Sequence, residues 1–395
     1  MEYKTTIIQR NKIRKAKYSA PDEGTIEESL LAKNISVLEI TQFRKDLARM
    51  RVGKKYLLQF FAKMRICYRI GMPILQTLEL CESVIPNKNL KKALQEIRKQ
   101  VAAGIDLATC LWKYPNIFPP VVCRLVEVGY RSGKMMEACD KIFYMLNIEM
   151  QTRRKVISAM YYPAMVMVAL IFAVYILITR TIPTFLGLFR GAGVELPLPT
   201  RLLVQITDTL TARPSVTLLC VVGIIGLILS IPKIYRSSYL FQRIILHIFP
   251  FGNLIKYSQR LNLVSTMYTI LEAQVPMISA LRMTRNAITN ISFKMAIVSA
   301  IKSVYNGKGI SDGLLAHEKL LTPELVKSLK FAEETGATVQ ILQSLQKEYE
   351  DGLEYQINLF KESINPIITV IIAVIVLFIL LALFLPMFSM TKVIK

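Results

Sequence analysis

The stretch AMVMVALIFAVYILITRTI lies between Pro163 and Pro183, and a second apolar stretch, IITVIIAVIVLFILLALFL, lies between Pro366 and Pro386. The first has polar residues only at its far end, and the second has only Thr369. As an α-helix of nineteen residues, each would be roughly 29 Å long, about the thickness of the hydrocarbon core of a bilayer. We therefore predict two membrane-spanning helices. A buried helix of a soluble protein is the alternative, although such helices are seldom this long without an interior charge.

A single offset of 203 positions relates the two stretches and extends far beyond them. Proline and glycine are prominent among the matched residues, and these residue types fix where helices begin, end and turn. An offset without gaps over such residues predicts a fold that is built twice. The matched pairs are Pro73 and Pro276, Leu78 and Leu281, Gly104 and Gly307, Leu111 and Leu314, Pro120 and Pro323, Gly133 and Gly336, Pro163 and Pro366, Pro183 and Pro386, and Phe185 and Phe388.

Residues 56–158 have a helical pattern that is interrupted at short intervals. Apolar residues recur every three or four positions, and turn sequences break this pattern, as at Gly71-Met72-Pro73 and Ile85-Pro86-Asn87. Such short connections predict an up-and-down bundle of about six helices. The second copy repeats the turns, so residues 233–363 are predicted to form a second bundle.

Residues 1–55 are predicted to form a small polar α+β region. The segment YKTTIIQRN at residues 3–11 has weak strand character, as does the segment at residues 37–40. Thr25 followed by Glu28 resembles a capping box, which would open a short helix.

These patterns predict an all-α membrane protein in which two duplicated cytoplasmic six-helix bundles are joined to three transmembrane helices, with the small α+β region at the N-terminus. The middle transmembrane helix is short for a span, but the chain must cross there if both bundles lie on the same side. The predicted order is an N-terminal cytoplasmic region at 1–55, the first bundle at 56–158, a transmembrane helix at 159–182, a periplasmic loop at 183–215, a transmembrane helix at 216–232, the second bundle at 233–363, a transmembrane helix at 364–388 and a periplasmic tail at 389–395.

The chain is strongly basic, with 50 Lys and Arg residues against 28 Asp and Glu residues and a net charge of +22. The excess lies in the segments that flank the predicted spans, including Arg153 and Arg154. Basic residues are enriched beside spans on the cytoplasmic side, where they face anionic lipids. We therefore interpret the charge as a surface facing the bilayer and expect no nucleic-acid partner, since no nucleic-acid-binding motif accompanies it.

The sequence offers little material for catalysis, and we expect no catalytic residue, metal site or cofactor. His247 and His317 have no neighbour in the sequence that would make either a ligand or a base. The segment NGKGIS at residues 306–311 resembles a phosphate-binding loop but lacks its first glycine, so we interpret it as a helix-ending turn. The six cysteines have no CxxC pair, which suits reduced thiols packed in a core.

The spans contain no Asp, Glu, His or Lys. Proton relays and ion paths need such residues facing a cavity. A small membrane transporter or channel is therefore kept only as the alternative function.

Two interhelical corners contain polar residues that could contact a partner. Phe331-Ala332-Glu333-Glu334-Thr335-Gly336 forms one corner, and Val128-Gly129-Tyr130-Arg131-Ser132-Gly133 forms the equivalent corner of the first copy. A Ser or Thr before Gly suits a tight corner, and an acid beside it can bind free backbone donors or a partner's base. The candidate partner-contact or corner residues are Ser132, Gly133, Glu333, Glu334, Thr335, Gly336, Arg153 and Arg154.

These residues together resemble the type II secretion F domain, which occurs twice in the inner-membrane platform proteins of type II secretion systems and type IV pili. The resemblance covers about residues 56–390. The matching motifs are Gly71-Met72-Pro73 with Leu78, Tyr114-Pro115 through Phe118-Pro119, Ser132-Gly133, Tyr162-Pro163, Ile182-Pro183-Thr184-Phe185, Glu195-Leu196-Pro197-Leu198-Pro199-Thr200, Val275-Pro276, Glu333 to Gly336, Asn365-Pro366 and Leu385-Pro386-Met387-Phe388.

The resemblance implies a non-enzymatic platform in the bacterial inner membrane that couples a cytoplasmic assembly ATPase to pilin or pseudopilin subunits. It also implies other inner-membrane assembly components as partners and a homodimer or higher oligomer. The family has a glutamate shortly before the Ser/Thr-Gly corner, which the second copy keeps as Glu333 and the first replaces with Tyr130. If that acid contacts a partner, the first copy has lost or altered the contact.

Overall fold

The computed structural model describes residues 2–9, 12–19, 25–26, 29–30, 36–42, 52–184, 200–201, 205, 207 and 239–393. Contacts divide the chain into two compact units, which we call the bundle unit and the stem unit. The bundle unit comprises Met1–Arg154, Gln242–Ile248 and Gly252–Tyr355; the stem unit comprises Lys155–Phe241, Phe249–Phe251 and Gln356–Lys395. The predicted transmembrane helix at 216–232 and most of the predicted periplasmic loop lie outside the described residues.

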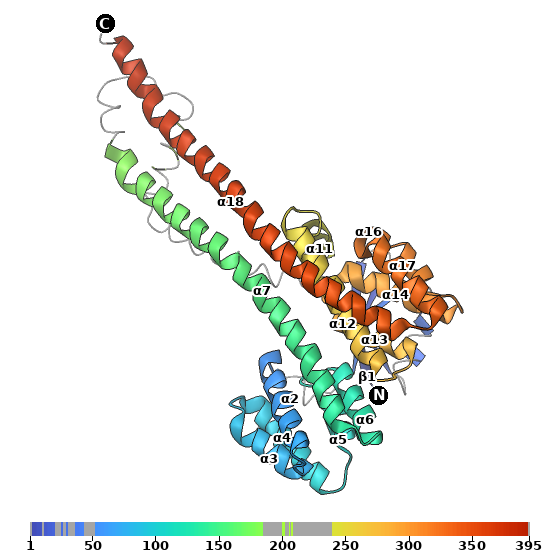
Figure 1. Cartoon of the computed structure of the whole chain (residues 1–395). Coiled ribbons are helices and arrows are strands. Elements are labelled where there is room, and N and C mark those ends of the chain that lie inside the picture. The colour runs from blue at the N-terminus through green and yellow to red at the C-terminus, as the bar shows by residue number, and fades with distance from the viewer. Residues whose placement is uncertain are drawn as a thin grey trace. The chain divides into compact units, whose positions relative to one another are not determined.

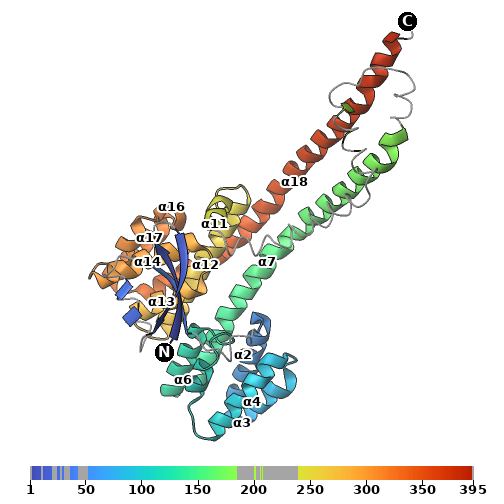
Figure 2. The same ribbon diagram turned by 180° about the vertical axis from the view of Figure 1, so that it is seen from behind.

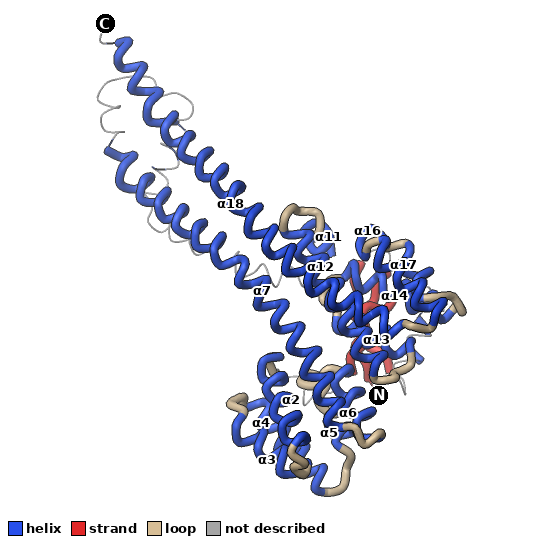
Figure 3. Tube along the Cα trace, in the orientation of Figure 1, coloured by secondary structure: helices blue, strands red, loops and turns tan. Residues whose placement is uncertain are grey.

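The first copy forms six helices around one buried core, as the interrupted periodicity predicts (Figures 1 and 3). Phe60 and Phe61 are fully buried at its centre, with ring centroids 4.9 Å apart in an edge-to-face arrangement. Such aromatic pairs contribute beyond the area that they bury. The helices are α2 (Lys54–Arg69), α3 (Ile74–Val84), α4 (Lys88–Ala102), α5 (Leu107–Trp112), α6 (Pro120–Arg131) and the first part of α7 (Met135–Ile176).

The second copy repeats this order of helices, shares its core with the first, and has two further short helices, α11 and α16, that the six-helix prediction did not include. Ile270, Val275 and Ala280 belong to the same buried cluster as Phe60 and Phe61. The periodicity of the sequence predicts two bundles but contains no sign of this shared core. The helices are α11 (Tyr239–Ile245), α12 (Phe251–Glu272), α13 (Met277–Ala287), α14 (Ile291–Tyr305), α15 (Ile310–Leu315), α16 (Glu318–Leu321), α17 (Pro323–Thr335) and α18 (Thr338–Val393).

Prolines and glycines mark the turns of both bundles at the positions that the repeat predicts. Pro73 and Pro276 precede the first residues of α3 and α13. Five glycines of the described segments have positive φ, namely Gly71, Gly104, Gly133, Gly307 and Gly336. After α2, for example, Gly71 N–H donates to Tyr68 O and Met72 N–H donates to Cys67 O, so the free carbonyls at the helix end are satisfied.

The second copy makes the first of these turns without glycine. Gln274 stands at the position equivalent to Gly71 and has a φ of 58°. It keeps the same hydrogen bonds, because Gln274 N–H donates to Leu271 O and Val275 N–H donates to Ile270 O. A side chain in this left-handed region is strained by contact between Cβ and the following carbonyl.

The N-terminal region contains a three-stranded antiparallel sheet in the order β2-β1-β3. Its strands are β1 (Glu2–Gln9), β2 (Lys12–Ser19) and β3 (Ser36–Gln42). Strands were expected near β1 and β3, whereas β2 was not predicted. The many basic residues of β2 obscure the alternation of apolar and polar residues that is typical of a strand. Ile7 pairs with Val37, and both are buried with Ile26 and Leu30 in a small separate core.

The sheet packs against α13 and α14 of the second copy, which are far from it in the sequence (Figure 2). Arg285 of α13 is only 1% exposed and donates a hydrogen bond from Nη1 to the carbonyl oxygen of Val37, at 3.2 Å. A buried guanidinium requires such acceptors because an unsatisfied buried charge is costly. Arg285 therefore links the N-terminal sheet to the second copy rather than to the first.

The stem unit contains the apolar parts of α7 and α18, which run as continuous helices through their prolines. Pro163 lies inside α7, and Pro366 and Pro386 lie inside α18. None of these three prolines ends its helix. A proline removes one backbone hydrogen bond, but an irregular backbone in hydrocarbon would leave more groups unsatisfied, so the helix continues.

The first stem differs from the second near its outer end. A π-helical turn, η1, occupies Leu177–Thr181, where Ile182 N–H donates to Leu177 O. Pro183 follows directly and has no N–H to continue the regular pattern. Residues 200–201, 205 and 207 are helical, and Thr200 Oγ1 donates to Ala382 O of α18 at 2.6 Å.

Both long helices expose their apolar residues. The most apolar part of the helix at Met135–Thr184 has a mean hydropathy of 2.3 and only 6% of it is buried. The corresponding values for Thr338–Ala382 are 3.0 and 17%. A core helix of a soluble protein would instead be mostly buried, so the exposure favours the prediction of membrane spans.

We expect Gln274→Gly to stabilise the protein by about 0.5–1 kcal/mol, because relief of the left-handed strain exceeds the added flexibility of glycine in the unfolded chain. Denaturant unfolding of the full chain in detergent measures the change. Gln274→Ala is the control, since alanine keeps the Cβ. An equal gain from alanine would contradict strain at this position.

Candidate functional site

The corner of the second copy directs Glu333 onto the N-terminus of α15. The carboxylate accepts hydrogen bonds from the backbone N–H groups of Ile310 and Ser311, the latter at 3.1 Å, and from Ser311 Oγ at 2.5 Å. These N–H groups have no acceptor within their own helix, and a negative charge also suits the helix dipole. Glu333 therefore satisfies free backbone donors inside the bundle.

The first copy reaches the same result with different residues. Asp106 accepts a hydrogen bond from Thr109 N–H at 3.2 Å and so caps α5, the helix equivalent to α15. Tyr130, which replaces the glutamate, is 55% exposed. The second copy has Gly309 in place of Asp106, and a Cβ there would lie 2.7 Å from Glu333 Oε2. A local aspartate and a distant glutamate are thus alternative caps for one helix end.

The remaining corner residues make local hydrogen bonds. Ser132 Oγ donates to Val128 O at 2.8 Å, and Thr335 Oγ1 donates to Phe331 O at 2.7 Å. Gly133 and Gly336 follow them with φ values of 71° and 70°. These residues account for the tight turns.

Three exposed candidate residues take no part in these hydrogen bonds. Glu334 lies beside Glu333 but outside its hydrogen bonds, and Arg153 and Arg154 lie on α7 just before the apolar part of that helix. None of the three has an ion-pair partner among the described residues. A role in contacting a partner stays a prediction for these three residues and for both corners.

The structure supports the interpretation of residues 306–311 as a helix-ending turn. Gly307 has a φ of 71°, and Lys308 N–H donates to Ser303 O as α14 ends. A phosphate would need the next free backbone N–H groups, but these already donate hydrogen bonds to the Glu333 carboxylate.

The histidines and cysteines form no reactive cluster in the described part of the chain. Burial lowers the pKa of His317, whose Nε2 lies 3.1 Å from Ser299 Oγ, so the ring is neutral at pH 7. No group of three His, Cys, Asp or Glu side chains that could hold a metal ion occurs among the described residues. Five cysteines are buried and unpaired, as expected, and burial raises the pKa of Cys81 and Cys139 to about 12. Cys220 lies outside the described residues.

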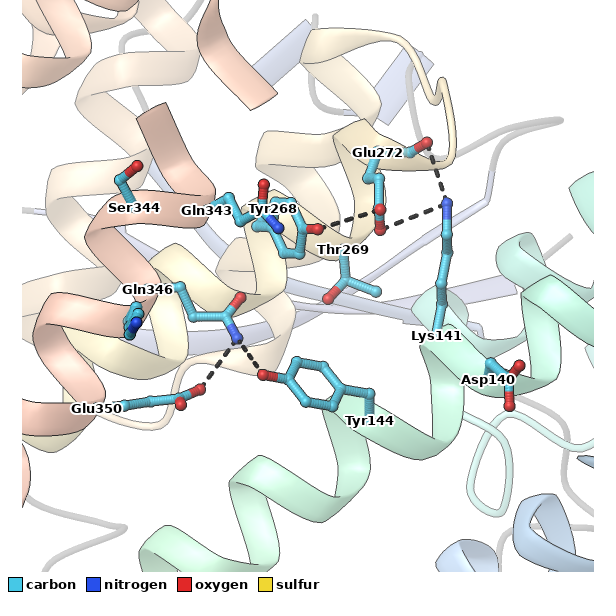
Figure 4. A pocket seen from close by; sticks show the side chains of 11 residues that line it. Asp140, Lys141, Tyr144, Tyr268, Thr269, Glu272, Gln343, Ser344, Gln346 and Glu350 are labelled. Carbon is cyan, nitrogen blue, oxygen red and sulfur yellow. Dashed lines mark hydrogen bonds and ion pairs between the residues drawn. The ribbon is translucent and has the colours of Figure 1, made fainter. Parts of the chain in front are cut away.

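A cleft that the sequence did not predict lies where the two copies meet (Figure 4). This inter-repeat cleft has a volume of about 690 Å³ and is lined by α7 of the first copy and by α12 and α18 of the second. Lys141 Nζ lies 3.4 Å from Glu272 Oε2 and donates to the carbonyl oxygen of Glu272 at 3.2 Å. One lysine thus binds both the side chain and the free helix end of the opposite copy.

A second contact crosses the same cleft. Gln346, which is 4% exposed, donates from Nε2 to Tyr144 Oη at 3.2 Å and to Glu350 Oε1 at 3.0 Å. Tyr268 Oη donates to the other oxygen of Glu272 at 3.1 Å. Burial, and after it the charge of Glu272, raises the pKa of Tyr268 to about 12, so this hydroxyl stays protonated and donates.

A signal for this cleft does exist in the repeat. In the first copy Asp140 binds Arg65 at 3.3 Å, within the copy. The equivalent positions of the second copy have Gln343 and Tyr268, which cannot form that ion pair, and Glu272 replaces Arg69. The change of charge from Arg69 to Glu272 thus falls at a position where the second copy contacts Lys141 of the first.

Comparison with known proteins finds the same repeat. The family described as "Type II secretion system (T2SS), protein F" matches residues 60–183 and again residues 263–386. The two matches begin and end 203 positions apart, which confirms the offset seen in the sequence. Together they cover more than half of the chain.

Relatives match nearly the whole chain. The "Type IV pilus assembly protein PilC" of Pseudomonas aeruginosa is 26% identical over 382 residues, which cover 93% of this chain and 99% of that protein. The protein of the same name from Thermus thermophilus is 26% identical over 390 residues, 97% of this chain and 96% of its own. The "Type II secretion system protein F" of Pseudomonas aeruginosa is 24% identical and covers 82% of this chain and 80% of its own.

We expect Glu333→Gln to destabilise the protein by about 1–2 kcal/mol, because a neutral amide is a weaker cap for α15 than a carboxylate. Urea unfolding of the full chain measures the loss. Glu334→Gln is the matched control and should change stability by less than about 0.5 kcal/mol.

A double variant tests whether the two caps can replace each other. Gly309→Asp alone should destabilise, because its side chain meets Glu333, whereas Gly309→Asp combined with Glu333→Tyr reproduces the first copy and should recover most of the loss. Failure of the pair to do better than Gly309→Asp alone would show that the two caps are not alternatives.

Charge reversal should reveal the ion pair across the inter-repeat cleft. We expect Lys141→Glu and Glu272→Lys each to destabilise, and the double variant to recover about 0.5–1 kcal/mol, the value of a partly exposed pair. Recovery stays partial because a glutamate at position 141 cannot donate to the carbonyl oxygen at position 272. Additive losses in the double variant would mean that the two residues do not interact.

Proposed function

Because the chain belongs to the type II secretion system protein F family, we propose that it is the non-enzymatic platform for assembling a type IV pilus or a type II secretion pseudopilus. The observation that carries this proposal is the double family match, supported by relatives that are aligned over nearly the full chain. The names of those relatives include both pilus assembly proteins and a secretion protein.

We place the protein in the bacterial inner membrane with both copies on the cytoplasmic side. The exposed apolar surfaces of α7 and α18 support insertion, since such surfaces are unfavourable in water. An additional crossing at residues 216–232 would bring the second copy back to the cytoplasm. Arg153 and Arg154 would then lie on the inner side, where basic residues are favoured.

The bundle unit is suited to transmitting motion rather than to catalysis. The shared core and the contacts of Lys141 and Gln346 hold the two copies together. A displacement of one copy would therefore move the other and, through the continuous helices α7 and α18, the stems. A cytoplasmic assembly ATPase would supply the motion, and pilin or pseudopilin subunits in the membrane would receive it.

Assembly in the membrane requires further partners. We propose contacts with other inner-membrane assembly components, and a homodimer or higher homo-oligomer. Arg153, Arg154 and the exposed residues of the two corners are the candidate contact residues. The two arginines would pair with acidic groups of a partner, and Glu334 would pair with a basic group.

Affinity purification of the full chain from its native membrane tests the proposal. We expect a hexameric ATPase and prepilin-like subunits to co-purify. The variant with Arg153→Glu and Arg154→Glu should recover less of both, because each reversal removes a basic residue worth about 1 kcal/mol beside anionic lipid and adds repulsion.

The matched control reverses two exposed lysines of α17, Lys327→Glu with Lys330→Glu, which changes the net charge equally. Normal recovery of partners with this control would assign the effect to the position of Arg153 and Arg154. Purification that yields neither an ATPase nor pilin-like subunits, together with solute flux in liposomes holding this chain alone, would overturn the platform in favour of a transporter.

A further inference from the structure

A small groove lies between α7 and α18 at the level where both helices change from charged to apolar sequence. Its volume is about 220 Å³. Ala159 and Ile364 lie at this contact and are 2% and 6% exposed. Four polar residues complete the lining: Ser158 and Tyr162 from α7, and Lys361 and Asn365 from α18.

The groove is formed by equivalent positions of the two repeats. Ser158 corresponds to Lys361, and Tyr162 corresponds to Asn365, at the offset of 203 positions. Equivalent turns of α7 and α18 therefore face each other at the groove. The side chains at these positions have diverged, so that one side has two hydroxyl groups and the other an ammonium and an amide.

The charge of the groove is positive and unpaired. Within the described part of the chain, Lys361 has no ion pair and the side chains of the other three polar residues have no hydrogen-bond partner. No carboxylate lines the groove; Glu362 follows Lys361 in the sequence but is not part of the lining. All four polar residues are exposed, so a ligand can reach them.

The depth of the groove limits the occupant. Pro163 and Pro366 begin the apolar stretches one residue after Tyr162 and Asn365, and Tyr162 is 60% exposed, as is typical of residues at the headgroup level. Arg153 and Arg154 precede the groove on α7. A basic pocket between membrane helices on the cytoplasmic side matches the headgroup of an anionic lipid.

We propose that this groove binds the phosphodiester group of an anionic phospholipid of the membrane that surrounds the stems. The Lys361 ammonium pairs with the phosphate, and the hydroxyls of Ser158 and Tyr162 and the amide of Asn365 donate to its oxygens. The acyl chains lie along the exposed apolar faces of α7 and α18. The lipid thereby joins the two stems where they enter the bilayer. This inference requires only that the stems enter a membrane and is independent of the role in filament assembly.

Native mass spectrometry of the full chain released from nanodiscs tests the proposal. The discs contain either phosphatidylglycerol or phosphatidylcholine. Both have the phosphodiester, but the headgroup of phosphatidylcholine adds a quaternary ammonium, which the Lys361 ammonium repels. We expect retained phosphatidylglycerol, little retained phosphatidylcholine, and about fivefold less retained phosphatidylglycerol for Lys361→Gln, the effect of losing one lysine contact to anionic lipid. Lys361→Arg should retain the lipid.

Two further variants separate the groove from general basic charge. Lys327→Gln removes one exposed positive charge outside the groove, and should change retention by less than twofold. Ser158→Trp keeps every charge but fills the groove, and should reduce retention as Lys361→Gln does. Equal losses from Lys327→Gln and Lys361→Gln would overturn the proposal, as would unchanged retention in Ser158→Trp.

The source of the phosphate is tested in the same samples. An excess of inorganic phosphate should leave the lipid bound, because a free ion lacks the acyl chains that contact the stems. Displacement of the lipid by inorganic phosphate would overturn a phospholipid as the occupant.

Discussion

The structure depends on one constraint, which is that hydrocarbon offers no partner for a free backbone N–H or C=O group. It explains why α7 continues through Pro163 and why α18 continues through Pro366 and Pro386. In water a proline usually ends a helix, because the exposed groups are satisfied by solvent. Here the apolar sequence that borders each proline favours an unbroken helix.

Duplication gives the two bundles the same turns, and divergence then changes how each turn is satisfied. The end of α12 keeps the hydrogen bonds of its counterpart although Gln274 replaces glycine. The start of α15 is capped by Glu333, and the start of α5 by Asp106. In both cases the same backbone groups need hydrogen-bond partners, and the residues that occupy the turn or supply the partner differ. The free N–H and C=O groups at a helix end must be satisfied, but more than one residue type can do this.

The contacts between the two copies include positions at which their side chains differ in charge. Asp140 binds Arg65 inside the first copy, whereas Glu272 of the second copy binds Lys141 of the first. Perfect repetition would give each copy its own closed set of ion pairs. The loss of symmetry frees charged groups for contact between copies, and the shared core around Ile270 and Val275 then holds them together.

The sequence by itself determined the elements that depend on local order: the duplication, the apolar spans, the six-helix pattern and the turns at Pro73, Pro276 and the glycines. Only the tertiary structure decided the long-range contacts, such as Lys141 with Glu272, 131 positions away, and Arg285 with Val37, 248 positions away. The physical reason is that periodicity and backbone preference act over a few residues. The choice of which buried faces meet, by contrast, is made by shape and charge across the whole fold.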